Sequence, residues 1–206
     1  LTKYYICVMQ SVDDKVTEQI NRTKPGTILF IEDFLDLGSN GAVHTALHRL
    51  VKAKKISRLA RGIYAKPTFS KLLNQDVLPG AEEVAIAIAK RDKARLLPTG
   101  AHAQNALGLS TQVPLRIVYL TDGSPRTIKI GNRTIQFKKT TPKNLALKGN
   151  ISKLVVQALK DIGKDKATAQ ELEKIQNVLL KEDKQDLKHD IAIAPQWIAE
   201  LMAKAL

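Results

Sequence analysis

The stretch that decides the fold is residues 40–66, which read NGAVHTALHRLVKAKKISRLARGIYAK. Apolar residues in its first half recur at helical spacing, which predicts an amphipathic helix over 41–54. Two short β-prone runs, 56–59 and 63–65, flank Ala60-Arg61-Gly62 and predict a tight hairpin. The stretch holds seven Lys or Arg and no Asp or Glu. A basic helix followed by a basic hairpin is suited to contact a polyanion.

The preceding residues predict the rest of a small domain. Apolar residues recur every four positions over 12–20, which predicts a first helix, and 27–37 reads as a strand followed by a short helix. Ser39 or Asn40 can cap the next helix by accepting a backbone N–H. The order helix, strand, short helix, turn, helix and two-stranded hairpin predicts a winged helix-turn-helix over residues 1–68.

In a winged helix, the polar face of the second long helix approaches DNA and the hairpin meets the backbone. Arg49 has the donors to pair with guanine O6 and N7, while Arg58 and Arg61 would meet phosphate. The alternative is an ordinary surface helix, because cations favour the C-terminal turn of any helix. The predicted DNA contacts are His44, Thr45, His48, Arg49, Lys52, Arg58, Arg61 and Lys66.

Composition also favours a polyanionic partner. Lys and Arg number 33 against 20 Asp and Glu, a net charge of +13. Residues 1–70 have 11 basic and 6 acidic side chains, a net charge of +5. Residues 71–150 have 13 basic and 5 acidic side chains, a net charge of +8, and residues 151–206 have no net charge.

Apolar runs fall well short of the ~20 residues that span a membrane. Cys7 has no partner for an intrachain disulfide, and 1–9 lacks the apolar length of a signal peptide, so we expect a cytoplasmic protein.

The remaining sequence predicts a connector and a second domain. Residues 69–80 read as a linker, and 81–206 as a mixed α/β domain. Within it we expect strands at 115–121 and in a hairpin around Gly131-Asn132, then helices from Ser152 onward, the last beginning at Pro195. The expected fold class is α+β: an N-terminal winged helix-turn-helix, then a mixed α/β domain with a small sheet and a helical C-terminus.

A second basic cluster occupies this predicted hairpin. It could bind nucleic acid or an acidic protein surface, or it could be a solvated hairpin whose lysines prevent edge pairing. Its members are Arg126, Lys129, Arg133, Lys138 and Lys139.

Metal-binding and catalytic motifs are weak. His44 and His48 have the spacing of a zinc-binding pair, but Thr45 stands where the metalloprotease motif needs Glu. Phosphate-loop, dinucleotide and nucleophile-elbow motifs are absent from the sequence. We therefore expect no metal, no cofactor and no catalytic residue.

One enzymatic alternative is a metal-dependent nuclease centred on Asp122 and Lys138. Gln136 would then stand where Mg²⁺ needs a charged carboxylate ligand. The turn sequence Asp122-Gly123 offers a simpler explanation of the aspartate.

Five segments resemble the AbiEi-type antitoxin and transcriptional regulator family, and the likeness extends from about Val12 to Trp197. They are FIEDFLDLG (30–38), LARGIY (59–64), PTGA (98–101), LGLST (107–111) and YLTDGSPR (119–126). The resemblance implies an N-terminal winged helix that binds inverted repeats in its own promoter and represses transcription. It also implies a C-terminal domain that antagonises a nucleotidyltransferase toxin, in a type IV toxin–antitoxin system linked to abortive infection by phage.

Applied to this sequence, the resemblance implies that helix 41–54 and Arg61 contact double-stranded DNA, and that 81–206 is the antitoxin region. A single winged helix reads only a few base pairs, so we expect two copies, as a homodimer, on paired half-sites. The runner-up is a stand-alone winged-helix regulator without antitoxin activity.

Overall fold

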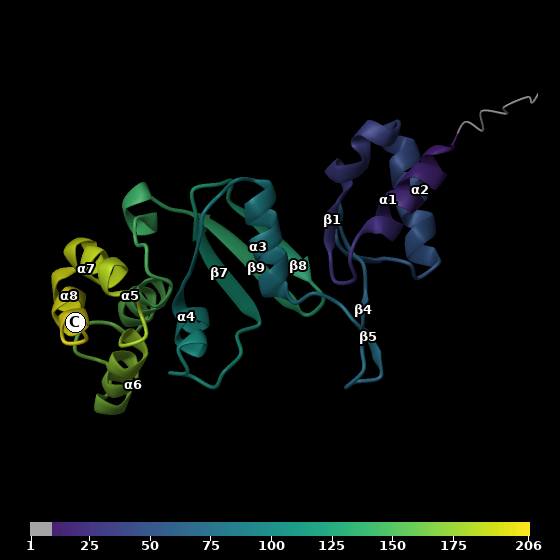
Figure 1. Ribbon diagram of the computed structural model, residues 1–206. Coiled ribbons are helices and arrows are strands. Elements are labelled where there is room, and N and C mark those ends of the chain that lie inside the picture. Colours follow the sequence, from purple (N-terminus) through teal and green to yellow (C-terminus); the bar gives the residue numbers. More distant parts are fainter. Residues whose placement is uncertain (1–9) are drawn as a thin grey trace, which may run out of the picture. The chain divides into compact units, whose positions relative to one another are not determined.

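The computed structural model describes residues 10–206 and contains two compact units, which divide between Gly80 and Ala81. Helices and small sheets are mixed in the chain, and its C-terminal part is helical (Figure 1), which confirms an α+β fold class. The expectations for Cys7 and for a signal peptide concern 1–9 and lie outside the described residues. No helix within 10–206 combines the length and the apolar character needed to cross a membrane.

The first unit begins with two helices, a 3₁₀ turn and a three-stranded sheet. Its strands run antiparallel in the order β1-β3-β2, with Phe30 opposite Ile63 and Ser57 opposite Ala65. The elements are α1 (Val12–Arg22), β1 (Ile28–Phe30), the 3₁₀ helix η1 (Ile31–Leu37), α2 (Asn40–Lys52), β2 (Ser57–Ala60) and β3 (Ile63–Ala65). This order follows the sequence prediction element by element.

Caps and a shared core fix these helices. The Ser11 hydroxyl accepts from the backbone N–H of Asp14 at the start of α1, and Ser39 does the same for Ala42 at the start of α2. Of the two candidate caps for α2, Ser39 and Asn40, the structure therefore has Ser39 in this role. One apolar cluster joins α1, η1, α2 and the strands; it includes Val16, Ile20, Leu29, Phe34, Val43, Ala46, Leu47, Leu50, Ile56 and Tyr64.

The predicted linker at 69–80 includes most of a short hairpin that was not expected from the sequence. There, β4 (Thr68–Ser70) pairs antiparallel with β5 (Gln75–Val77), and the Ser70 hydroxyl accepts from the backbone N–H of Leu73 in the turn. Strands of three residues are too short to show an alternating pattern, which explains why the hairpin was not predicted. The hairpin exposes five large apolar side chains, those of Phe69, Leu72, Leu73, Val77 and Leu78.

The second unit combines a four-stranded sheet with helices. The strand order is β6-β7-β9-β8; β7 and β9 are parallel, and the other neighbours are antiparallel. The elements are α3 (Ala81–Arg91), β6 (Leu96–Pro98), α4 (Gly100–Ala106), β7 (Arg116–Thr121), β8 (Arg126–Ile130), β9 (Arg133–Lys139), the 3₁₀ helix η2 (Pro142–Leu145), α5 (Asn150–Ile162), α6 (Ala169–Leu179), α7 (Lys184–Ile193) and α8 (Gln196–Ala203).

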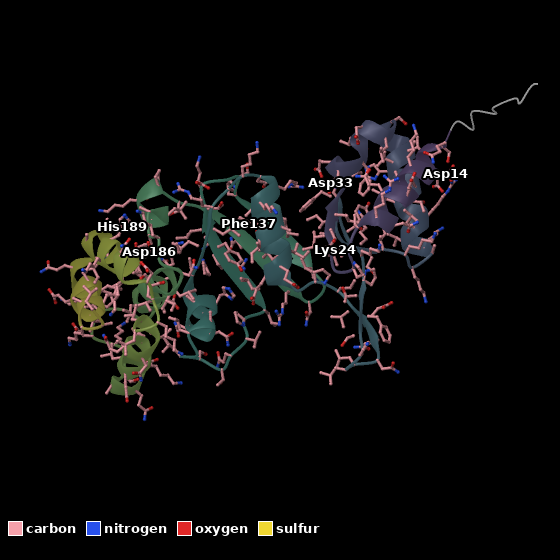
Figure 2. The ribbon with its side chains drawn as sticks, in the orientation of Figure 1. Asp14, Lys24, Asp33, Phe137, Asp186 and His189 are labelled. Carbon is pink, nitrogen blue, oxygen red and sulfur yellow. The ribbon has the colours of Figure 1, made fainter. Side chains whose placement is uncertain are left out.

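The predicted hairpin around Gly131 is present, and Gly131 has the positive φ of 57° that its turn requires. Side chains alternate across the sheet, so Ile117, Ile135 and Phe137 share one buried face. Helix α3 packs against β9 (Figure 1), and the Phe137 ring lies 6.3 Å from that of Tyr119 (centroid to centroid; Phe137 is labelled in Figure 2).

Helix α5 is central to the C-terminal helices and packs its apolar face against α6, α7 and α8. Carboxylates distant in sequence hold its N-terminal end. Glu182 Oε2 accepts from the backbone N–H of Ile151 (2.7 Å) and Ser152 (2.8 Å). The buried Asp190 accepts from the backbone N–H of Lys148 and Gly149, each at 2.8 Å. These bonds satisfy amides that a helix start leaves without partners.

Thr99 is the N-cap residue of α4, and its hydroxyl donates to the Val118 carbonyl oxygen (3.3 Å). The predicted start of the last helix needs correction. Pro195 precedes α8 as its N-cap residue and is not inside the first turn. Helix α7 was not predicted, because the buried face of this helix includes the charged Asp190, which breaks the apolar periodicity.

Candidate nucleic-acid interface

The polar face of α2 is exposed along its whole length. Its apolar residues are buried in the core of the first unit, so helical geometry turns the intervening residues outward. The exposed residues are those predicted from the sequence: His44, Thr45, His48, Arg49 and Lys52. The Thr45 hydroxyl donates to the carbonyl oxygen of Gly41 (2.9 Å), so its oxygen is left as an acceptor.

A hollow of about 320 Å³, the α2–hairpin hollow, brings part of this face together with the β2–β3 hairpin. Four of its lining residues were predicted as DNA contacts, and Val51 and Tyr64 were not. The described lining residues carry no carboxylate: they are His44, Thr45, His48, Val51, Arg58 and Tyr64. Tyr64 is largely buried, and nothing in its strand sequence distinguishes it from a core residue.

Backbone contacts set the position of the hairpin. The Gly62 carbonyl oxygen accepts from the backbone N–H of Ile31 (3.0 Å), which ties the hairpin turn to η1. Gly62 has a positive φ of 71°, as a tight turn requires. Arg61 stands exposed at this turn, while the Arg58 side chain donates to the Ala60 carbonyl oxygen (3.4 Å). Both guanidinium groups therefore belong to a hairpin whose turn is fixed.

Arg49 has an acidic neighbour that the sequence did not reveal. Its Nη1 lies 3.5 Å from Asp13 Oδ1, in the first turn of α1. The two side chains are 67% and 41% exposed, so water screens the pair and its net contribution is about 0–1 kcal/mol. No periodicity links residues 36 positions apart, and the pair is visible only in the folded unit.

Lys66 differs from the other predicted phosphate contacts. Its ammonium donates to the backbone carbonyl oxygens of Ile20 (3.0 Å), Asn21 (3.1 Å) and Thr23 (2.7 Å) at the C-terminal end of α1. An α-helix leaves its last carbonyls unpaired, and a cation there is favourable. We therefore correct the prediction and assign Lys66 a structural role, because its donors are directed at the protein.

Lys66→Met is expected to lower the free energy of unfolding of the first unit by about 1–2 kcal/mol, since it removes charge-assisted bonds at a helix end. The salt dependence of any DNA binding should stay unchanged. Chemical denaturation and salt-dependent binding titrations measure the two quantities. A shallower salt dependence would return Lys66 to the set of phosphate contacts.

The second basic cluster does not form one surface. Strand register places Lys129 and Lys138 on the face of the sheet opposite Phe137, where the exposed Arg116 joins them. Arg133 and Lys139 have the same parity as Phe137 and point to the other side of the sheet. Arg116 was not predicted as a member of this cluster, because its neighbour on the parallel strand β9, Thr134, is 18 residues away.

Arg126 has partners of its own. Its guanidinium pairs with Asp92 and lies 5.4 Å from the centre of the Phe137 ring, a cation–π contact. Burial raises the pKa of Asp92, but bonds from Arg91 and Arg126 outweigh it and lower that pKa overall. We therefore infer that Arg126 stabilises the sheet. The three basic residues on the opposite face, which we call the open basic face, are Arg116, Lys129 and Lys138.

The aspartate of the nuclease alternative is engaged elsewhere. The side-chain Nε and the backbone N–H of Arg95 both donate to the Asp122 carboxylate, each at 2.8 Å, and these bonds lower the pKa of Asp122. Lys138 is in register with Leu120 on the neighbouring strand. Within residues 10–206, the His, Asp and Glu side chains form no group of three or more that could hold a metal ion.

Comparison with known proteins supplies a family. Residues 15–187 match the family described as DUF6088, a family of unknown function, and this match extends over parts of both units. No curated protein matches the sequence. The chain therefore belongs to the DUF6088 family.

Proposed function

We propose that this protein is a DNA-binding transcriptional autorepressor and an antitoxin, and that its first unit is a winged helix-turn-helix. In this proposal α2 enters the major groove and the β2–β3 hairpin is the wing. The observation that carries it is the α2–hairpin hollow, where an exposed polar helix face meets a basic hairpin and no described lining residue is acidic.

The assigned contacts follow from chemistry and position. Arg49 and the two histidines of α2 present donors to base edges, and Arg58 and Arg61 supply cations for phosphate. Arg49 can leave Asp13 for DNA, because their exposed ion pair contributes little. Two copies would bind an inverted repeat in the promoter of the protein's own operon, with half-sites one or more helical turns apart.

The antitoxin role belongs to the second unit and is supported by the resemblance to the AbiEi-type family. The partner would be a nucleotidyltransferase toxin, and the open basic face of Arg116, Lys129 and Lys138 is a candidate contact for an acidic surface on it. Both roles would be carried out in the cytoplasm. In the stand-alone regulator alternative, the same unit would have no toxin partner.

Footprinting and gel-shift experiments on DNA upstream of the gene test the first role. We expect protection of paired repeats, with binding at least ten times tighter than to shuffled DNA of the same length. Equal binding to both DNAs would reject sequence-specific repression.

For the second role, the full chain and residues 1–80 are each co-expressed with the proposed nucleotidyltransferase toxin. Growth restored by the full chain alone supports antitoxin activity, whereas no restoration favours the stand-alone regulator.

Arg61→Ala is expected to weaken DNA binding on specific and shuffled sequences alike, because a lost phosphate contact carries no sequence information. The slope of log K against log salt should become shallower by about 0.9, one released counterion. Lys24→Ala removes the same charge from an exposed residue outside the hollow and should leave the slope nearly unchanged. Equal effects of the two variants would contradict a role for Arg61 in the wing.

A further inference from the structure

A second cavity, of about 380 Å³, lies between η2, α5 and the junction of α7 with α8. It belongs to the second unit and shares no residue with the α2–hairpin hollow. Its volume lies within the range of small-molecule sites, about 300–1,000 Å³. The described residues that line it combine two lysines and an asparagine with an apolar wall.

The lysines give the cavity an unbalanced positive charge. Lys143 comes from η2 and Lys160 from the last turn of α5, and the described lining includes no carboxylate. Partial burial and, next, the Lys143 charge lower the pKa of Lys160. A cation in this position would be stabilised by an anion bound between the two ammonium groups.

Most of the other lining residues are apolar. Leu147, Val156, Ile193 and Pro195 provide the wall, and an inorganic anion alone would leave them uncovered. Asn144 also lines the cavity; its amide nitrogen donates to the Thr140 hydroxyl (2.9 Å), which fixes its orientation and leaves its carbonyl oxygen as an acceptor. The lining therefore suits a molecule with one anionic end and one planar or apolar end.

We propose that this cavity binds a small phosphate monoester with a planar or apolar group, of the size of a mononucleotide. A phosphate monoester carries a charge of about −1.5 to −2 at pH 7, which matches two ammonium groups. Lysine binds phosphate as a point charge, whereas a planar carboxylate is better matched by the arginine fork. Lys143 and Lys160 hold the phosphate, and the wall formed by Leu147, Val156, Ile193 and Pro195 holds the other end.

Calorimetric titration of the full chain with AMP, adenosine, glucose 6-phosphate and inorganic phosphate tests this proposal. AMP should bind at least ten times more tightly than each of the others, because only AMP offers both ends. Lys143→Gln and Lys160→Gln should each weaken AMP binding at least tenfold. Lys188→Gln, an exposed lysine of α7 outside the cavity, should change it less than twofold.

An NMR pH titration of ¹³C-labelled lysine gives a second readout. AMP should raise the pKa of Lys160, because the phosphate charge stabilises its ammonium form. Lys143→Gln should also raise this pKa in the absence of AMP, because it removes the repulsion between the two ammonium groups. AMP binding that both glutamine variants leave intact would overturn the proposal. Adenosine binding as tightly as AMP, or no response of Lys160 to saturating AMP, would also overturn it.

Discussion

Asp190→Asn should lower the free energy of unfolding of the second unit by about 2–4 kcal/mol, the largest effect we expect from a single isosteric change. Both carboxylate oxygens of this buried residue accept backbone N–H groups, from Lys148 and Gly149. The His189 ring nitrogen Nδ1 lies 2.8 Å from Oδ1. An asparagine amide has one acceptor oxygen, so its NH₂ group would face one of these donors.

Asp186→Asn is the matched control, because it removes the same charge from the same helix (Asp186 and His189 are labelled in Figure 2). Asp186 lies in the first turn of α7, so its loss should cost about 0.3–1 kcal/mol through the helix dipole. Urea denaturation monitored by circular dichroism gives the unfolding midpoints of the two variants. Equal midpoints would mean that the buried Asp190 carboxylate contributes no more than the Asp186 carboxylate in the first turn of α7.

The second large effect concerns recognition. Arg49→Ala should weaken binding to the specific DNA site by about 1–3 kcal/mol and binding to shuffled DNA much less, if the guanidinium pairs with a guanine. Asp13→Asn should strengthen binding by about 0.2–1 kcal/mol, because it frees Arg49 from its ion pair. The gel shifts proposed above measure both changes.

A double-mutant cycle separates the ion pair from simple charge repulsion. In the Arg49→Ala background, the gain from Asp13→Asn should shrink, because no guanidinium is left to free. Asp36→Asn removes an exposed acid of η1 and provides the matched control. If Asp13→Asn gives the same gain with and without Arg49, Asp13 acts only through its charge on the DNA.

The sequence predicted features that depend on local periodicity. The polar face of α2 was placed residue by residue, because buried Val43, Ala46, Leu47 and Leu50 fix the rotation of the helix. The hairpin at Gly131 followed from its turn residues. Helix α7 escaped prediction for the opposite reason, since a buried aspartate occupies its inner face.

Contacts between residues far apart in the sequence could not be predicted from local periodicity or turn residues. Lys66 reads as one more basic residue after a hairpin, and its bonds to α1 exist only after the chain has folded. The same is true of Lys143 and Lys160, which come from different elements to one cavity. The high content of Lys and Arg at 126–139 is visible in the sequence, but the strand register places these side chains on two opposite faces of the sheet.

The carboxylates at the start of α5 affect how deletions of this protein must be designed. Glu182 and Asp190 follow α5 in the chain, so a nascent polypeptide that stops at Leu180 has made the whole helix but none of its caps. Stepwise C-terminal truncation would therefore expose the middle of the second unit to proteolysis well before it reached α5. Fragments of the second unit should therefore keep residues 148–190 together, and the roles of single residues in this unit are better tested with point variants of the full chain.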